Sequence, residues 1–480
     1  MKKRTKLNKT MKPHWIWAIA LGSAIGWGAF VQPFNWMTTA GPMGVIIGFS
    51  IGALLMMLIA VSYGFLIKSF PVSGGEFAYA YISLGRTHAF ISGWFLTLGY
   101  ICIVALNASA VSLMFKYIFP TLIENFSLYT IAGWEVYGME IIIATLILLV
   151  FGYLNVKGTS ISGRMQFIFA LIMVVGVVLL TVLIGIQPSA GLENIKPYFP
   201  TNTTALAAII SIVAIAPWAF VGFDVVPQAA EEFDFPAKKA FTLIILAIFF
   251  AAVLYSLMIL ATSMAAPWES IASENHLWGT AHVVRKILGS GGLIILVVAL
   301  SMGIFTGLNG FVLASSRLLF SMSRAKIMPE VFGKLHPKHE TPYVAIIFTV
   351  IVSSVAPWFG REVLVWVVDM SSIGVSIAYL YTCYTSFYLF KWSQDKITNP
   401  NIQVVSPFKK SISLLGAICS TIFILLLLIP ASPAFLGIES RIALLVWIIL
   451  GILFYLYKRK KYKDIPESEL SYLILGKDHT

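Results

Sequence analysis

Residues 14–33 read HWIWAIALGSAIGWGAFVQP, an apolar run with three glycines in its middle. The run is long enough to cross a bilayer, which takes about 20 apolar residues in a helix. Glycine weakens a regular helix, and lipid offers no partner for the backbone groups that an interrupted helix leaves free. Such a segment is therefore expected only where it faces protein, a cavity or a ligand. We interpret residues 22–28 as one half of a substrate-binding site.

The composition of the 480-residue chain is typical of a membrane protein. Hydrophobic residues make up 59% and charged residues 11%, whereas an average soluble domain has about 25% charged residues. The net charge of +12 does not indicate nucleic acid as a partner, because the basic residues lie in short segments between and beyond the apolar runs. The three cysteines lie within apolar runs, so no disulfide framework is expected.

Apolar runs of about 20 residues or more predict about twelve transmembrane helices, and hence an all-α polytopic membrane protein. The expected spans are 14–35, 41–68, 88–118, 137–156, 161–187, 204–230, 238–264, 290–323, 342–360, 362–391, 411–430 and 440–457. Lysine and arginine gather at the N-terminus, in alternate connections and after residue 458, and such residues favour the cytoplasmic side. We therefore expect a multi-pass protein of the cell membrane with both termini in the cytoplasm.

The sixth apolar run repeats the interruption of the first. Residues 216–224 read APWAFVGFD, with a proline that cannot donate to the helix ladder, a glycine, and a carboxylate, Asp224, within the span. Glycine- or proline-broken segments in corresponding positions of two halves indicate an inverted-repeat transporter with its site near the middle of the membrane. These two runs lie five spans apart.

The two breaks together can bind both ends of a zwitterion. Where a half-helix begins, unpaired N–H groups and the positive end of the helix dipole attract a carboxylate. Where a half-helix ends, free carbonyl groups attract an ammonium group or a metal ion. Glycine is suited to such a site because it lets the ligand approach the backbone.

Four motifs in this order resemble the amino acid, polyamine and organocation (APC) superfamily of secondary transporters. They are GWGAF at 26–30, PVSGGEFAY at 71–79, FVGFD at 220–224 followed by AEE at 230–232 and Pro236, and Asn309 with ASSRLLFSMSR at 314–324, Pro329 and His336–Pro337. The resemblance implies a LeuT-type fold, in which five helices are repeated upside down with the first and sixth helices broken, plus two C-terminal helices.

The resemblance also implies a division of the chain and no separate soluble domain. Residues 1–13 form a cytoplasmic N-terminus, and 14–393 form the transporter core, with repeats at approximately 14–187 and 204–393. Helices 11–12 occupy 394–457, and 458–480 form a short polar cytoplasmic tail.

In similar transporters, backbone N–H groups of the glycine motif hold the substrate's carboxylate, which implies this role for Trp27 and Gly28. Carbonyl groups of both broken helices hold its ammonium group, which implies Ala24, Trp218 and Val221. The predicted substrate site as a whole is Ala24, Gly26, Trp27, Gly28, Tyr100, Trp218, Phe220, Val221 and Asp224. Within it, Trp218 and Phe220 match positions that form the pocket wall or a gate, and Tyr100 is a candidate from the third span.

Asp224 is the most informative single residue, because a carboxylate at membrane depth is costly unless it is paired or hydrated. It can pair with a cationic substrate, make a gate contact, carry a proton during transport, or accept a structural hydrogen bond from nearby backbone. Asp369, in the tenth span, has the same alternatives. Arg317 is expected to be an anchor whose charged end reaches the membrane surface, or a gate partner.

Two departures from the family pattern bear on substrate and coupling. Trp27 stands where relatives have a small residue, and its indole can shrink the cavity, seal it, or present a ring to an organic cation. Organic amines and polyamines therefore remain alternative substrates to amino acids. Met173 stands where some proton-coupled or exchanging relatives carry a lysine. Sodium, a proton through Asp224 and simple exchange all stay open as modes of coupling, and no cofactor or metal site is expected.

Other function classes are weighed against transport. An enzyme would need convergent histidine, aspartate or metal ligands, and the chain has no H-E-x-x-H, G-x-S-x-G or Walker-type motif. The seven histidines lie at the ends of spans, in loops or in the tail. A channel would be expected to repeat rings of like charge or pore-loop carbonyls, and a ligand sensor would bind without uptake. We predict a secondary active transporter, a permease or an exchanger, of small amino acids or related solutes; its oligomeric state is not predicted.

Overall fold

The computed structural model describes residues 4–476 except 132, 275, 361–362, 393–406, 431 and 433. The α-helices are α1 (Pro13–Ile25), α2 (Gly28–Val31), α3 (Pro33–Ser69), α4 (Gly75–Ile118), α5 (Pro120–Ile123), α6 (Gly138–Lys157), α7 (Thr159–Gly185), α8 (Ala205–Ala214), α9 (Ala216–Ala219), α10 (Val225–Gln228), α11 (Lys239–Ala265), α12 (Trp268–Ser273), α13 (Gly279–Arg324), α14 (Tyr343–Ser353), α15 (Val363–Trp392), α16 (Pro407–Leu428), α17 (Ile438–Lys463) and α18 (Glu467–Leu475). Short 3-10 helices are η1 (Leu192–Ile195), η2 (Ala230–Glu232), η3 (Glu330–Gly333) and η4 (Ala356–Phe359), and the strands are β1 (Ser127–Ile131) and β2 (Trp134–Tyr137).

Helices of membrane-spanning length dominate the fold. Within the described residues, nine helices are long and apolar enough to cross a membrane, namely α3, α4, α6, α7, α11, α13, α15, α16 and α17. The broken segments α1–α2 and α8–α10 and the shorter helix α14 supply the remaining three of the expected twelve. The prediction of an all-α polytopic membrane protein is confirmed.

Three of the long helices bend at a glycine with a positive φ angle. These are Gly41 in α3 (φ 67°), Gly85 in α4 (φ 78°) and Gly289 in α13 (φ 65°). The expected spans began near 41, 88 and 290, so the sequence boundaries fall at these kinks. The apolar runs predicted the membrane-crossing part of each helix, but not the helical segment that precedes its glycine.

The outer helices present apolar side chains to their surroundings, as a protein in a lipid bilayer must. Leu146 on α6, Val175 on α7 and Ile422 on α16 are 57%, 54% and 49% exposed. In water such a surface would be costly, whereas lipid tails solvate it. The three cysteines are free, as predicted.

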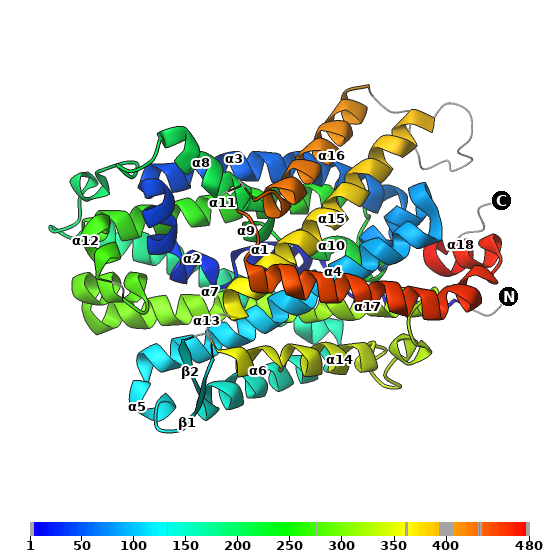
Figure 1. Cartoon of the computed structure of the whole chain (residues 1–480), viewed down its shortest axis with the longest axis horizontal. Coiled ribbons are helices and arrows are strands. Elements are labelled where there is room, and N and C mark those ends of the chain that lie inside the picture. The colour runs from blue at the N-terminus through cyan, green and yellow to red at the C-terminus, as the bar shows by residue number, and fades with distance from the viewer. Residues whose placement is uncertain are drawn as a thin grey trace.

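Helix α1 lies at the centre of the molecule, where it packs against α7, α11 and α13 (Figure 1). Helix α4 packs along α15, and α16 and α17 pack against α15 from the outside. The first broken helix is therefore enclosed by the helices of both halves. Lipid does not reach its interrupted backbone, in agreement with the expectation from the glycines.

Both described chain ends lie at one end of the molecule (Figure 1). Arg4 donates hydrogen bonds to the carbonyl oxygens of Leu473 and Ile474 in α18, at 3.1 and 3.2 Å. Helix α18 is packed into the protein through the buried side chains Leu470 and Ile474. The polar composition of residues 458–480 gave no indication of this helix. The expected boundary between the core and the last two helices, at 393–394, lies outside the described residues.

A short antiparallel hairpin of β1 and β2 follows α5 and precedes α6. It was not expected, because its eleven-residue stretch is too short and too polar to register beside the long apolar runs. It lies at the opposite end of the molecule from the termini (Figure 1). Lys116 on α4 lies 4.4 Å from the ring centroid of Trp134 in β2 and pairs with Glu140 on α6 at 3.4 Å.

Candidate functional site

The first predicted break lies between α1 and α2. Helix α1 ends at Ile25, Gly26 adopts φ 49° with its N–H bonded to the carbonyl of Gly22 at 3.1 Å, and α2 begins at Gly28. Among the described residues, the N–H groups of Trp27 and Gly28 have no acceptor within hydrogen-bonding distance. The donors that the resemblance assigned to a substrate carboxylate are therefore free in this structure.

The second predicted break lies between α8 and α10. Helix α8 ends at Ala214, α9 covers four residues, and 220–224 form turns before α10. Gly222 adopts φ 142°, and a Cβ atom placed on it would lie only 2.5 Å from the backbone nitrogen of Ala24. Glycine is required here on both counts. The two breaks thus meet backbone to backbone, although about 200 residues separate them in the chain.

Side chains from two other helices hold the breaks together. The hydroxyl of Tyr255, on α11, lies within hydrogen-bonding distance of the carbonyl oxygens of Ala24 and Ala219, at 2.9 and 2.8 Å. The hydroxyl of Thr306, on α13, donates to the carbonyl of Gly22 at 2.9 Å. The Tyr255 hydroxyl has one proton, so it donates to one of its two carbonyl groups at a time, and the Gly22 carbonyl accepts from Thr306 in addition to the N–H of Gly26. The sequence reasoning missed both residues, because nothing in their own spans marks them.

Aromatic rings surround the meeting point of the breaks. Trp27 and Trp218 lie edge to face with ring centroids 6.4 Å apart, and Trp36 lies 6.5 Å from Trp218 on another side. Phe49, on α3, contacts Phe220 at 6.1 Å. The structure therefore brings together the predicted Trp27, Trp218 and Phe220, and adds Trp36 and Phe49 from α3, which the sequence did not single out.

A cavity of about 550 Å³ leads from the end of the molecule opposite the termini towards the first break. Its lining includes Trp27, Gln32 and Trp278, together with residues of α12. Of the predicted site residues, Trp27 lines this cavity. Ala24, Trp218 and the others are buried beneath it or beside it. Trp27 is thus the residue at which the open cavity meets the buried breaks.

Some buried polar atoms at the two breaks have no partner. Among the described residues, these include Ser23 Oγ and Trp27 Nε1 at the first break and Asp224 Oδ2 at the second. A fourth, Asn107 Oδ1 on α4, lies 3.7 Å from the position that a Cβ atom of Gly26 would occupy. Unpaired buried polar atoms cost stability unless a ligand or water satisfies them. A polar ligand between the breaks would supply partners for these four atoms.

One carboxylate oxygen of Asp224 makes a structural hydrogen bond to the backbone, and the other has no partner among the described residues. Its Oδ1 atom accepts a hydrogen bond from the N–H of Gly222 at 2.7 Å, which is the structural role. Its Oδ2 atom is free to meet a substrate, a proton or a cation. Tyr100 does not line the open cavity; its hydroxyl donates to the backbone carbonyl of Asp224 at 3.0 Å. Tyr100 therefore supports the second break from α4.

A second buried carboxylate, that of Glu76, lies near Asp224. The sequence analysis included Glu76 in the motif at 71–79 and assigned it no role. Glu76 is fully buried at the start of α4 and accepts hydrogen bonds from the hydroxyl of Tyr63 at 2.9 Å and from the amide of Gln228 at 2.6 Å. Gln228 ends α10, so this group joins the second broken helix to α3 and α4. The glycine pair before Glu76 was the signal that could have pointed to it.

Ion pairs close the molecule at the end that carries the termini. Glu231, in η2, accepts hydrogen bonds from Arg324 at 2.7 and 2.9 Å and also pairs with Arg4. Burial raises the pKa of Glu231, but attraction to Arg324 and Arg4 outweighs burial and leaves the pKa below its ordinary value of 4.5. The carboxylate is therefore charged at neutral pH, and it connects the N-terminal segment to α13.

Arg317 and Asp369 also have partners that decide between their alternatives. Arg317 is fully buried and pairs with Glu232 at 2.8 Å. Its charged end therefore does not extend to the membrane surface, and of the two expected roles the contact agrees with that of a gate partner. Asp369 accepts a hydrogen bond from the hydroxyl of Ser440 at 2.6 Å and connects α15 to α17. It is not among the residues that line the cavity.

Comparison with known proteins agrees with this architecture. The family model of amino acid permeases matches residues 16–463 of the chain. The branched-chain amino acid permease BcaP of Bacillus subtilis (strain 168) is 28% identical, with 93% of this chain and 92% of that protein covered. The methylthioribose transporter of the same organism is 28% identical, with 77% and 79% covered. The aromatic amino acid transport protein AroP of Escherichia coli (strain K12) is 24% identical, with 96% and 97% covered.

These matches confirm the resemblance that the four motifs carried, and they favour transport over membrane-embedded catalysis. The family match extends from the first broken helix to the end of α17, so it includes both breaks and the pairs of Glu231 with Arg324 and of Glu232 with Arg317, whereas Arg4 precedes it. The chain belongs to the amino acid permease family of the amino acid, polyamine and organocation superfamily, and it is a transporter and not an enzyme.

Proposed function

We propose that the protein transports amino acids with small, uncharged, apolar side chains across the cell membrane, by alternating access around the two touching breaks. The observation that carries this proposal is the group of unpaired polar atoms at the breaks, which includes the free N–H groups of Trp27 and Gly28. N–H groups attract a carboxylate, and carbonyl oxygens attract an ammonium group. An α-amino acid carries both in one small unit.

The surroundings of the breaks favour an uncharged side chain. Among the described residues that line the cavity there is no aspartate, glutamate, lysine or arginine. The walls at the breaks are Trp27, Trp218 and Phe220, which offer apolar surface and leave little room for a long side chain. One of the relatives is a permease of branched-chain amino acids, whose side chains are uncharged and apolar.

Alternating access requires that one end be open while the other is closed. In this structure the cavity opens at one end, and the Glu231 and Arg317 ion pairs close the other. We assign the closed end, with both termini, to the cytoplasm, because the lysine and arginine residues gather there. Transport then consists of turning Trp27 aside, seating the substrate between the breaks, and separating the ion pairs.

A second candidate substrate class is organic amines. It is favoured by the free Oδ2 atom of Asp224 and by the indole of Trp27, both of which can stabilise an organic cation. An amine would leave the N–H groups of the first break unpaired. For that reason we rank amines below amino acids.

Thermal unfolding of the purified protein with three matched ligands separates these classes. Leucine has both charged groups, 3-methylbutylamine lacks the carboxylate, and 4-methylpentanoate lacks the ammonium group. A ligand at 100 times its Kd stabilises the native state by about 2.7 kcal/mol. We expect leucine alone to raise the melting temperature. A rise with the amine and none with leucine would replace the proposal by amine transport.

A variant of the first break tests whether the site is where we place it. Gly28→Leu would drive a side chain into the ring of Trp218, whose Cη2 atom lies 3.1 Å from the position of a Cβ on Gly28. Gly185→Leu, at the end of α7, has no atom within 4 Å and serves as the matched control. We expect leucine binding to be lost in the first variant and kept in the second. Counterflow of labelled leucine in liposomes then distinguishes transport from binding alone.

A further inference from the structure

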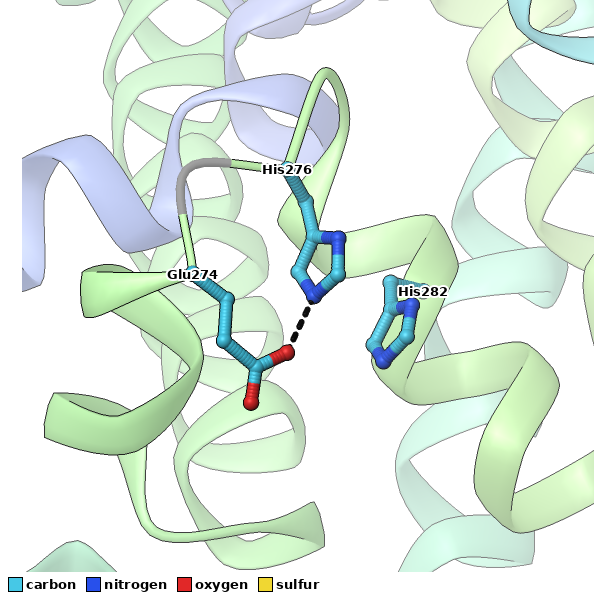
Figure 2. Close-up of side chains that lie close together, drawn as sticks. All are labelled: Glu274, His276 and His282. Atoms are coloured by element: carbon cyan, nitrogen blue, oxygen red, sulfur yellow. Dashed lines mark hydrogen bonds and ion pairs between the residues drawn. The ribbon is translucent and has the colours of Figure 1, made fainter.

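Three metal-ligating side chains meet in the connection between α12 and α13, away from the breaks. Glu274 follows the last turn of α12, His276 lies in the loop, and His282 lies in the first turns of α13 (Figure 2). One ligand atom from each of the three lies within 4.8 Å of the other two. Among the described residues, this is the one group of three such side chains that are close enough to hold a metal ion.

The three side chains are in direct contact with one another. His276 Nε2 and Glu274 Oε2 are 2.6 Å apart, and the rings of His276 and His282 are stacked with centroids 3.7 Å apart. No hydrogen bond joins the imidazole of His282 to any other described residue, and its ring lies against that of His276 (Figure 2). A neutral imidazole offers one nitrogen lone pair, and a carboxylate offers an oxygen. Two nitrogen atoms and one oxygen atom are thus available at one point.

We propose that Glu274, His276 and His282 form a binding site for Zn²⁺. Zinc takes imidazole nitrogen and carboxylate oxygen together, at about 2.0–2.2 Å, and completes a tetrahedron with water when the protein supplies three ligands. Ligand atoms of such a tetrahedron lie roughly 3.4 Å apart. His276 Nε2 and Glu274 Oε2, which are 2.6 Å apart, must therefore separate by about 0.8 Å, and the stacked rings must turn so that a nitrogen of His282 faces the same point. The side chain of Glu274 is 51% exposed and that of His276 is 26% exposed, which leaves room for both movements and for water.

The ligand types select among cations. Magnesium and calcium prefer oxygen ligands, and a site with two imidazoles offers them too few. Zinc, and the neighbouring transition metals, accept imidazole readily. The sequence gave no indication of this site, because Glu274, His276 and His282 have none of the spacings of known zinc motifs. The loop between the end of α12 and the start of α13 brings the three side chains together.

A metal at this position would clamp the loop that covers the cavity. His276, Leu277 and Trp278 all line the cavity, and Trp278 donates a hydrogen bond from its indole to the carbonyl of Phe30 in α2 at 2.9 Å. Fixing Glu274 to His282 therefore also holds the second half of the first broken helix. Because alternating access requires this region to move, bound Zn²⁺ is expected to slow uptake. This second step rests on the transport function, whereas binding of the metal does not.

The direct test measures metal binding without any substrate. The full-length protein is purified through a tag that contains no histidine and titrated with Zn²⁺ by calorimetry. Co²⁺ replaces Zn²⁺ for visible absorption spectroscopy, because Zn²⁺ itself is d¹⁰ and silent. We expect one Zn²⁺ per chain, a Co²⁺ spectrum of tetrahedral type, and no response to Mg²⁺. No zinc binding at a hundred micromolar would overturn the proposal.

Variants assign the binding to these residues. Loss of an outer-shell partner alone lowers metal affinity by roughly 10–100-fold, so loss of a direct ligand in His282→Ala or Glu274→Gln should lower it by about 100-fold or more. The matched control is His339→Ala, because His336 and His339 also form a stacked pair, at 4.7 Å, and His336 Nδ1 already accepts backbone N–H groups. Equal losses in the control and in His282→Ala would overturn the assignment.

Uptake measurements test the clamp. In liposomes, Zn²⁺ added at the face opposite the termini should reduce amino acid uptake by the unaltered protein about tenfold or more. The same addition should leave uptake by His282→Ala unchanged relative to its own zinc-free rate. Zinc binding without any effect on uptake would refute the clamp and retain the site. Absence of uptake in zinc-free liposomes would instead count against the proposed substrate.

Discussion

The contact between the two breaks makes a quantitative prediction for Gly222→Ala. The added Cβ atom would lie 2.5 Å from the backbone nitrogen of Ala24 and 2.9 Å from the Cβ atom of Ser23. Ordinary contact begins near 3.4 Å, so the breaks must move apart by about 0.9 Å. Overpacking of this kind costs about 1–3 kcal/mol. The φ angle of 142° adds about 1–3 kcal/mol for any residue with a Cβ atom.

A matched variant separates these two costs. Gly158, between α6 and α7, adopts φ 129°, and a Cβ atom there would meet nothing within 4 Å. Gly158→Ala therefore carries the backbone strain without the collision, and its effect should be limited to about 1–3 kcal/mol of stability. Gly222→Ala should cost about 2–6 kcal/mol in total. Thermal unfolding in detergent compares the two variants.

Binding should distinguish the variants more sharply than stability does. A displacement of about 1 Å in a site can reduce its function about 100-fold. We therefore expect the affinity for leucine, measured by competition on the purified protein, to fall about 100-fold in Gly222→Ala and to remain within about threefold in Gly158→Ala. Equal affinity in both variants would show that the ligand does not bind between the breaks, and the reasoning would fail.

The remaining predictions concern the gate, the cavity and coupling. Glu231→Gln leaves Arg4 and Arg324 without a counter-charge, which should lower the free energy of unfolding by about 3–5 kcal/mol. The variant should also open the end that carries the termini, so that a thiol reagent added at that end labels the cysteines of the protein faster. Because the pKa of Glu231 lies below its ordinary 4.5, its stabilisation is complete above that pH and should be lost as the pH falls further below it, as melting curves would show. Trp27→Ala should admit larger side chains, so that phenylalanine competes with leucine better than in the unaltered protein. Asp224→Asn should change the pH profile of uptake if Oδ2 carries a proton; an unchanged profile would leave only its structural bond to the backbone.

The fold could be predicted from the sequence because its main determinants are local. A membrane helix satisfies its own backbone, so apolar length alone identifies it. The glycine-broken first run and the proline-broken sixth run were recognisable because lipid permits few exceptions. The hairpin of β1 and β2 and helix α18 could not be predicted in this way, since both depend on contacts with other parts of the chain outside the apolar spans.

The candidate site could be predicted only in part, for a related reason. Residues on the breaks themselves carry the sequence signal, as Trp27, Gly28 and Trp218 show. Tyr255 and Thr306 act on the breaks from regular helices, where a tyrosine or a threonine has no distinguishing pattern. Their roles follow from how α11 and α13 pack against α1, which is tertiary information.

The same packing explains how opening at one end can be coupled to closing at the other. Gly222 contacts Ala24 directly, and the hydroxyl of Tyr255 lies within reach of both broken helices, so neither break can shift without disturbing the other. The second broken helix continues into Glu231, whose partner Arg4 also bonds to α18. In the transport cycle that we propose, a substrate bound between the breaks acts on the ion pairs through this short path, and the termini, which lie far from the cavity, belong to the gate.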